Sequence, residues 1–229
     1  MRCAGVSTRR ISFGSAENRE PAGAHAGPRT DGLGLDDARK ESSPGNWPSR
    51  DDRHPVILDV GCGSKKFPGA IGIDVNPNSD ADTLHDLNTI PYPYADDTFD
   101  MIVCDNCLEH LGDVVAVMEE LHRIAKPSAN VKIIVPFYAS RYAHTDPTHR
   151  HFFGWRSFDY FIPGTSFREF RYSSIAYEMV SVEYQRGWRI RGIRRLVCRL
   201  ANRFKDYYEE YFAGIFPMGD ITFELRVIK

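Results

Sequence analysis

The chain has 229 residues, which is enough for one α/β domain with a sizeable core, or for one domain and a tail. Its formal net charge is −2, from 29 basic and 31 acidic residues, and no apolar run reaches the 18 residues of a membrane span, so bulk properties favour neither nucleic acid nor membrane as a partner. Its five cysteines are an odd count without the spacing of a disulfide framework, which predicts a reducing, cytoplasmic location.

The first 52 residues differ in composition from the rest. They are rich in Gly, Pro, Ser, Arg and Asp and contain only two aromatic residues, Phe13 and Trp47. Such a stretch buries too little apolar surface to offset its ordering entropy, so we expect residues 1–52 to be a disordered leader and residues 53–229 to be the folded domain. Residues 7–13, "STRRISF", resemble a twin-arginine export signal, but polar residues follow where an apolar segment is required, and we expect no export.

Strand patterns then alternate with a helix pattern. Short apolar runs, as buried parallel strands have, occupy 55–60, 70–74, 99–105 and 130–136, and a weaker strand is expected near 82–85. Asp113 is a candidate N-cap for a helix whose apolar residues recur at helical spacing until Pro127 stops it. Alternation of this kind predicts an α/β, Rossmann-like, doubly wound and mostly parallel sheet.

The C-terminal part has a different pattern. Residues 177–184 and 221–229 alternate between apolar and polar side chains, which predicts an antiparallel strand pair that closes the sheet. A basic helical insertion at 186–216 separates them, with its helix expected over 189–212.

The basic insertion allows several interpretations. Residues 186–205 carry eight Arg or Lys and no acid, and apolar residues recur among them at helical spacing: Ile190, Ile193, Val197, Leu200 and Phe204. A helix that packs by its apolar face and solvates its basic face explains this pattern. Binding of an anionic acceptor, or peripheral contact with an anionic membrane surface through 186–205, explains it as well. One basic stripe without a recognised module is weak support for RNA.

The stretch "ILDVGCGSKKFPGAIGID" at 57–74 predicts a ligand turn. Gly61 and Gly63 let the backbone turn sharply and approach a ligand, and Asp74 ends the next strand, where it is placed to accept both hydroxyls of a ribose. The dinucleotide fingerprint fails because Lys66 stands at its last glycine position, and the P-loop pattern is absent. Asp59, just before the glycines, would oppose a pyrophosphate but favours a ligand with an ammonium and a sulfonium group. That ligand is S-adenosylmethionine.

This D-x-G-x-G turn with its following acid resembles the class I S-adenosylmethionine-dependent methyltransferases, most closely the methyltransferase type 11 group. The resemblance spans about 55–136, including "HDLNTIPYPYADDTFD" (85–100) and "FDMIVCDNCLEHL" (99–111). It implies these cofactor-binding residues: Asp59, Gly61, Cys62 and Gly63 for the methionine part, Asp74 for the ribose, Asp86 and Leu87 for the adenine, and Asp105 and Asn106 near the methionine end.

One departure from the family pattern concerns the first crossover. Only residues 64–70 separate the glycine turn from the second strand, where a βαβ unit usually has ten or more connecting residues. We therefore expect a first crossover helix that is shortened to about a turn. Other segments must then cover the methionine end of the cofactor.

We expect a lid over 138–176, since the family places this segment over the transferable methyl. It contains His144, Asp146 and His149, for which three interpretations compete. The side chains can build a structured loop; His144 or His149 can act as a general base; or the three can hold a metal ion. Without a recognised metal spacing we predict no metal. His110, after Glu109, is either a packing residue at a helix start or catalytic.

The predicted activity is transfer of a methyl group from S-adenosylmethionine to a small-molecule acceptor, with O-methylation of a sugar or secondary metabolite favoured. The acceptor is anionic if the basic insertion contacts it. An RNA methyltransferase is the alternative within the enzyme class, although nucleic acid is the less favoured partner. A cofactor-binding regulatory protein without activity is the alternative from another class.

Overall fold

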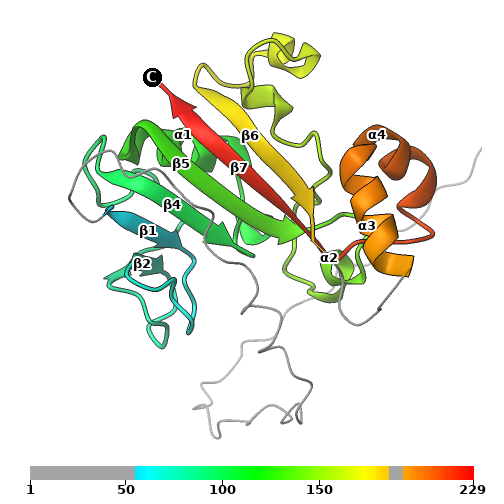
Figure 1. The fold of residues 1–229 in the computed structure, drawn as a ribbon. Helices are drawn as coiled ribbons and strands as arrows, with labels where there is room; N and C mark the ends of the chain where they lie inside the picture. Colours follow the sequence, from blue (N-terminus) through cyan, green and yellow to red (C-terminus); the bar gives the residue numbers. More distant parts are fainter. Residues whose placement is uncertain (1–54, 186–192) are drawn as a thin grey trace, which may run out of the picture. The chain divides into compact units, whose positions relative to one another are not determined.

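The computed structural model describes residues 55–185 and 193–229 (Figure 1). The expected leader and the first part of the basic insertion, 186–192, lie outside these residues. The described part contains one seven-stranded sheet in the order β3-β2-β1-β4-β5-β7-β6. Its strands are β1 (Ile57–Val60), β2 (Ile71–Asp74), β3 (Thr83–Leu84), β4 (Phe99–Asp105), β5 (Ala125–Pro136), β6 (Ala176–Tyr184) and β7 (Asp220–Ile228).

The strand directions confirm the predicted fold class. The strands β3, β2, β1, β4 and β5 pair in parallel, whereas β7 runs antiparallel to both of its neighbours, β5 and β6. The strand order reverses between β1 and β4. In open sheets of this kind the crevice at the carboxyl ends beside that reversal is where ligands bind.

The helical segments are few and mostly short. They are the 3₁₀ helix η1 (Leu108–His110), α1 (Val114–Ile124), α2 (Arg141–Thr145), the 3₁₀ helices η2 (Asp159–Phe161) and η3 (Ser166–Phe170), α3 (Ile193–Arg203), α4 (Lys205–Tyr207) and the π-helical turn η4 (Tyr208–Phe212). Residues 61–70, between β1 and β2, form turns without a helix, so the shortened first crossover is confirmed. No helix of the described residues is both long and apolar enough to cross a membrane.

The helix α1 begins as predicted and ends earlier. The Asp113 side chain accepts a hydrogen bond from the Ala116 N–H (3.0 Å), which confirms the N-cap. The helix stops at Ile124 rather than at Pro127, because Ala125 is already extended and pairs with Phe99 of β4. Strand β5 therefore starts five residues before the predicted strand, and Pro127 lies within it.

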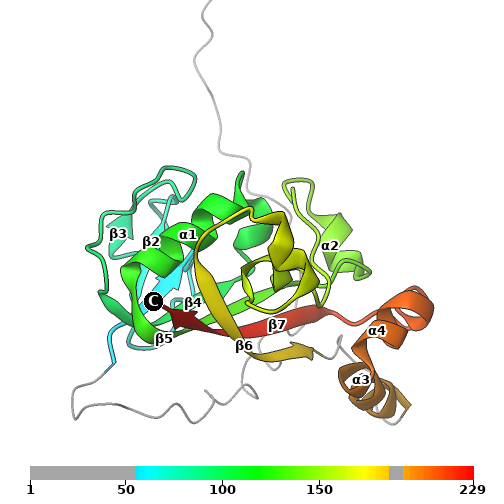
Figure 2. The ribbon, with the colours of Figure 1, turned by 90° about the horizontal axis from the view of Figure 1, so that it is seen from above.

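The segment after β5 shares the hydrophobic core with α1, and both lie on the same side of the sheet (Figure 2). The buried Tyr177 joins them: its hydroxyl donates to the Met118 carbonyl of α1 (2.9 Å), and its ring meets Phe161 edge-on. Phe158 packs against Phe223 of β7 with ring centroids 4.6 Å apart. Part of the predicted lid is thus fixed core.

The helix α3 packs on the sheet through a face that differs from the predicted apolar stripe. Asn202 accepts from the Tyr184 N–H of β6 (2.8 Å), and Cys198 and Ala201 are buried beside it. Leu200 and Phe204, which the sequence pattern places on the packing face, are exposed instead. The apolar residues of this helix therefore form two stripes. One contains Cys198 and Ala201 and packs on the sheet, and the other contains Leu200 and faces solvent.

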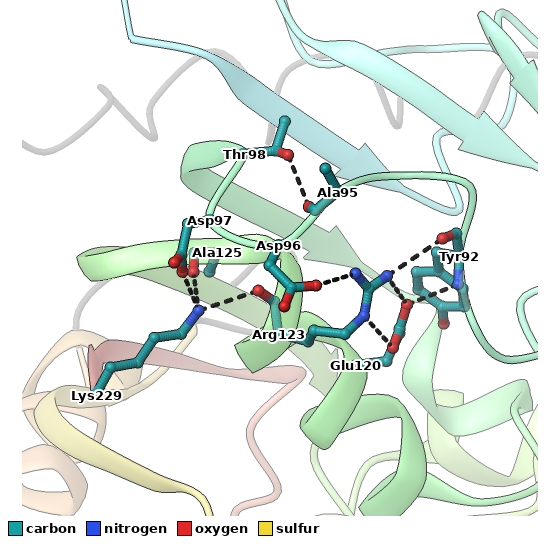
Figure 3. A network of polar contacts seen from close by, with 9 residues as sticks. All are labelled: Tyr92, Ala95, Asp96, Asp97, Thr98, Glu120, Arg123, Ala125 and Lys229. Carbon is teal, nitrogen blue, oxygen red and sulfur yellow. Dashed lines mark hydrogen bonds and ion pairs between the residues drawn. The ribbon is translucent and has the colours of Figure 1, made fainter.

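A buried carboxylate anchors the loop before β4 (Figure 3). Glu120 of α1, 4 % exposed, accepts from the Tyr92 N–H (2.6 Å) and from two nitrogens of Arg123 (2.5 and 2.9 Å). Arg123 also bonds Asp96 (2.6 Å), and Lys229 at the other end of the network joins Asp97 to the end of α1. The loop that leads from β3 to β4 is thereby fixed to α1.

We expect Glu120→Ala to lower the free energy of unfolding by about 2–3 kcal/mol, because it removes the buried partner of the Tyr92 N–H and of Arg123. The matched control is Glu178→Ala, which removes an exposed cross-strand pair with Arg226 and should cost less than about 1 kcal/mol. Urea unfolding followed by circular dichroism measures both. Equal losses in the two variants would contradict the assignment.

Candidate functional site

The turn after β1 is closed on one side and open on the other. Gly61 has a φ of +69°, and a Cβ there would lie 2.5 Å from Cys107 Sγ, so this position admits only glycine without a shift of its neighbours. Gly63 also has a positive φ, +53°, but a Cβ there would meet no atom within 4 Å. The turn is therefore pressed against the segment after β4 at Gly61 and leaves open space at Gly63.

Two carboxylates hold this turn in place. Asp59 is buried and its Oδ2 accepts from the Phe67 N–H (2.7 Å), which fixes the short crossover. Asp74, half-buried at the end of β2, accepts from the Gly63 N–H through Oδ2 (2.9 Å) and from the Asn76 N–H through Oδ1 (2.8 Å). The predicted ribose acid thus lies directly beside the glycine turn.

Cys62 lies between these two acids. Burial, with the charges of Asp59 and Asp74, raises the pKa of its thiol to about 11. The side chain is therefore a neutral thiol near pH 7. The same two charges give the turn a negative potential, which suits a cationic ligand.

The loop after β3 approaches the same edge of the sheet. The exposed Asp86 accepts from the backbone and side-chain amides of Asn88 (2.9 and 3.0 Å), and these bonds lower its pKa, so it stays ionised. Both bonds use Oδ1. The Leu87 carbonyl accepts from the hydroxyl of the buried Tyr92 (3.0 Å), which links this loop to the Glu120 network.

The turn after β4 brings further side chains to the site. Asn106 has a φ of +51°, its N–H donates to the Ile134 carbonyl of β5 (2.8 Å), and its side-chain amide donates to Asp105 (2.7 Å). The Asn88 side chain accepts from the Gly112 N–H (2.7 Å), so the loop after β3 and the turn after β4 are joined.

Glu109 in this turn carries a buried carboxyl group. Its side chain is 1 % exposed, and neither carboxylate oxygen has a hydrogen-bond partner among the residues that the structure describes. Burial raises its pKa to about 7, and the carboxylates of Asp105, Asp220 and Asp146 contribute to the rise. Its nearest ionisable neighbour is His149, whose Nε2 lies 4.0 Å from Oε1.

His110 and His149 complete a cluster with Glu109, and their rings meet edge-on with centroids 4.7 Å apart. His149 Nδ1 lies 3.0 Å from the Ala143 carbonyl, which only accepts, so Nδ1 carries the proton. His110 Nδ1 lies 2.9 Å from the Thr148 hydroxyl, which donates to Asp146 (2.7 Å), so this Nδ1 also donates. Both imidazoles therefore have an unprotonated Nε2 when they are neutral.

The sequence suggested a cluster of His144, Asp146 and His149. The structure instead brings His149 together with Glu109 and His110. His144 is exposed, its Nε2 lies 2.9 Å from the Tyr138 carbonyl, and its ring stacks on Phe152, away from the cluster. Asp146 reaches His110 only indirectly: it accepts a hydrogen bond from the Thr148 hydroxyl, which in turn accepts from His110 Nδ1. In the described residues, the ligand-type atoms of Glu109, His110 and His149 lie within 4.8 Å of one another. Glu109 was not predicted as a site residue from the sequence. The available signal was the adjacent pair of Glu109 and His110 shortly after β4.

A family of methyltransferase domains matches the chain over residues 42–182. The chain belongs to this family. Similar solved structures include an S-adenosylmethionine-dependent methyltransferase of Archaeoglobus fulgidus, 19 % identical, with 75 % of this chain and 86 % of that chain covered and a TM-score of 0.46. A methyltransferase of Haloferax volcanii in complex with the Trm112 activator is 15 % identical (76 % and 83 % covered, TM-score 0.49), and one of Mesorhizobium loti is 16 % identical (75 % and 90 %, TM-score 0.43).

This methyltransferase uses S-adenosylmethionine as its cofactor. The residues at the ends of β1 and β2 fit that molecule. The open space at Gly63 allows a ligand to approach the backbone, and the negative potential of Asp59 and Asp74 favours its ammonium and sulfonium charges over any phosphate.

We expect Gly63→Ala to weaken cofactor binding about tenfold or more, because the new methyl group fills the open space where the ligand approaches and the positive φ is strained. The control is Gly164→Ala, a position with a φ of +85° and equally open surroundings outside the turn. It carries the same kind of strain and should leave the affinity unchanged. Calorimetric titration with S-adenosylmethionine measures both, and equal affinities would contradict the assignment.

Proposed function

We propose that this methyltransferase methylates a hydroxyl oxygen of a small-molecule acceptor, such as a sugar or a secondary metabolite. The observation that carries the proposal is the position of Glu109 and His149: Glu109 belongs to the turn after β4, whose Cys107 lies against Gly61 of the cofactor turn, and His149 of the lid reaches it with Nε2 4.0 Å from Oε1. A hydroxyl oxygen is a weak nucleophile until its proton is removed, and this pair supplies the group that removes it.

In this proposal the cofactor residues divide the ligand among them. Asp59, Gly61, Cys62 and Gly63 hold the methionine part, Asp74 the ribose, Asp86 and Leu87 the adenine, and Asp105 and Asn106 the methionine end. Asp86 supports its assignment, because its Oδ1 is already bonded to Asn88 and the exposed Oδ2 is left to accept from an amino group. When bound, S-adenosylmethionine supplies a methyl carbon made electrophilic by the attached sulfonium.

His149 takes the acceptor proton. Its Nδ1 hydrogen bond to the Ala143 carbonyl fixes the tautomer in which Nε2 accepts, and Glu109 stabilises the imidazolium that forms. The acceptor oxygen forms its bond to the methyl carbon as the carbon–sulfur bond breaks, and the bonding pair stays on sulfur. His144 has its Nε2 engaged at the Tyr138 carbonyl and is the weaker candidate.

The lid contributes by excluding water. Phe137, Phe153 and Phe158 are buried along the segment that leads over the carboxyl end of β5. A nucleophile that has lost its hydration attacks faster, and positioning of the two reactants alone is worth roughly 7–11 kcal/mol of the barrier.

We expect His149→Ala to lower kcat by about 10²-fold or more with unchanged affinity for S-adenosylmethionine, because it removes the proton acceptor and not the cofactor site. His144→Ala, in the same loop, should stay within threefold of the wild type. Initial rates with labelled cofactor and a panel of sugars and nucleotides measure both. A tenfold loss only in His144→Ala would transfer the role to that residue.

The same assay, with RNA added to the panel, decides between this proposal and its rivals. Transfer to RNA with strong salt dependence would favour an RNA methyltransferase. Tight cofactor binding without turnover on any acceptor would favour a regulatory protein without activity.

The exposed stripe of α3 supports a place for the enzyme at an anionic membrane surface. Leu196 and Leu200 of α3 are 56 % and 49 % exposed, and Phe204, the residue directly after the helix, is 52 % exposed. The side chains immediately before them, Arg195, Arg199 and Arg203, are exposed as well and form a parallel basic stripe. Adjacent apolar and basic stripes on one helix suit the boundary between anionic headgroups and acyl chains.

We expect the chain to sediment with phosphatidylserine-containing vesicles and to remain in solution with neutral ones. Replacing Leu196, Leu200 and Phe204 together by serine should lower the bound fraction at least fivefold. The change removes the apolar side chains that would insert between the acyl chains. Leu84→Ser, which replaces an equally exposed leucine of β3, is the control. Equal binding of the triple variant would contradict the membrane contact.

A further inference from the structure

We propose that Glu109, His110 and His149 form a binding site for one divalent transition-metal ion. The cluster lies at the carboxyl ends of β4 and β5, next to the cofactor turn, and nothing in the family match assigns it. The ion's role toward the acceptor, given below, rests on the proposed function, whereas the binding site itself rests only on the geometry of these three side chains.

The first support is the environment of Glu109. A fully buried carboxylate is costly unless hydrogen bonds or a cation compensate its charge. Both of its oxygens lack a hydrogen-bond partner in the described part of the chain, although the surrounding turn offers several N–H groups to other acceptors. An ion between Glu109 and the two histidines supplies the missing compensation.

The second support is the orientation of the two imidazoles. Each donates its Nδ1 proton to an oxygen, His110 to Thr148 and His149 to the Ala143 carbonyl. Each therefore has an unprotonated Nε2 when it is neutral, and that of His149 lies 4.0 Å from Glu109 Oε1. One ligand-type atom of each of the three side chains lies within 4.8 Å of the others, and unprotonated atoms this close repel without a cation or a proton between them.

The distances are compatible with one ion. His149 Nε2 and Glu109 Oε1 are 4.0 Å apart, and all three ligand atoms lie within 4.8 Å of one another. Ligands bound at about 2.1 Å around one tetrahedral ion are about 3.4 Å apart, so the side chains need to close by roughly 1 Å. The separation is too long for a hydrogen bond between histidine and carboxylate, which argues against a directly shared proton.

An outer shell orients these ligands. Asp146 accepts from the Thr148 hydroxyl (2.7 Å) and from its N–H (2.8 Å), and Thr148 in turn accepts from His110. Carboxylates that act through a second group on a ligating histidine are a regular feature of metal sites. Asp146 together with Asp105 and Asp220 also adds negative potential at Glu109, which attracts a cation.

The donor set selects the class of metal. Two imidazole nitrogens and one carboxylate suit Zn²⁺, Mn²⁺, Co²⁺ or Fe²⁺, whereas Mg²⁺ and Ca²⁺ prefer sites made of oxygen atoms alone. Three protein ligands leave at least one coordination position open. The acceptor's hydroxyl oxygen can take that position, where the ion lowers the pKa of the hydroxyl. With the ion bound, His149 Nε2 is a ligand, so the proton leaves to water and His149 serves as the base only in the ion-free enzyme.

Binding is tested on the full chain after treatment with a chelator and dialysis. Calorimetric titration with Mn²⁺, Zn²⁺ and Co²⁺ should show one ion per chain, and bound Co²⁺ should give the visible absorption of a site with nitrogen ligands. Glu109→Gln and His149→Gln should each weaken binding about 100-fold or more, and Asp146→Asn about 10- to 100-fold. Mg²⁺ should bind far more weakly than the other ions.

The control is His144→Gln, a histidine of the same loop outside the cluster, which should leave the affinity within twofold. Binding that is lost in His144→Gln, or that is unchanged in Glu109→Gln, would overturn the assignment. If a variant fails to fold, the wild type still decides: Co²⁺ must raise its melting temperature, because an ion that binds only the folded chain stabilises it. No rise would overturn the site.

The two proposals fail separately. Ion binding without methyl transfer to any hydroxyl acceptor would leave the site standing and refute the proposed function. Full transfer by the chelator-treated enzyme, with no ion bound, would refute the ion's role toward the acceptor, and the absence of ion binding by the wild type would refute the site; both outcomes leave the proposed function standing.

Discussion

The turn after β4 is the constraint on which the site depends. Its Cys107 fills the space that only a glycine at 61 leaves free. Its Glu109 carbonyl accepts from the Arg150 N–H of the lid (2.7 Å), and Gly112 donates to Asn88 in the loop that carries Asp86. The glycine turn, the loop that carries Asp86 and the lid thus all contact one short segment. A shift of this segment would displace all three together.

The same turn explains why the site is electrostatically unusual. The turn contacts three neighbouring segments, at Gly61, Arg150 and Asn88. The Glu109 side chain is buried in the same turn without hydrogen bonds to the described residues. The buried Glu120, in contrast, is compensated by the Tyr92 N–H and by Arg123. The contrast between the two glutamates places a buried carboxyl with a raised pKa at the carboxyl edge of the sheet, beside the glycine turn, and groups of this kind gather at functional sites.

The sheet was predictable from sequence because its strands are short apolar runs with local signals at their ends. The Asp113 side chain caps the helix α1, so the helix start was predicted correctly. The end was predicted too late, at Pro127, because the backbone is already extended at Ala125. The site was harder. Spacing placed His144 and His149 in one loop, yet only the path of that loop turns His149 toward Glu109 and His144 toward its own backbone. Burial of Glu109 depends on contacts that a single sequence does not display.

The first crossover is made of turns without a helix. Under the proposed function, the segment after β5 has to cover the cofactor end of the sheet in its place. That segment is not uniform: Phe158 and Phe161 belong to the core, and moving them would expose large apolar surfaces to water. Residues 141–148 are mostly exposed and carry few core contacts. This portion also holds Asp146 and Thr148, which orient His110, so a movement of residues 141–148 would release that orientation as well.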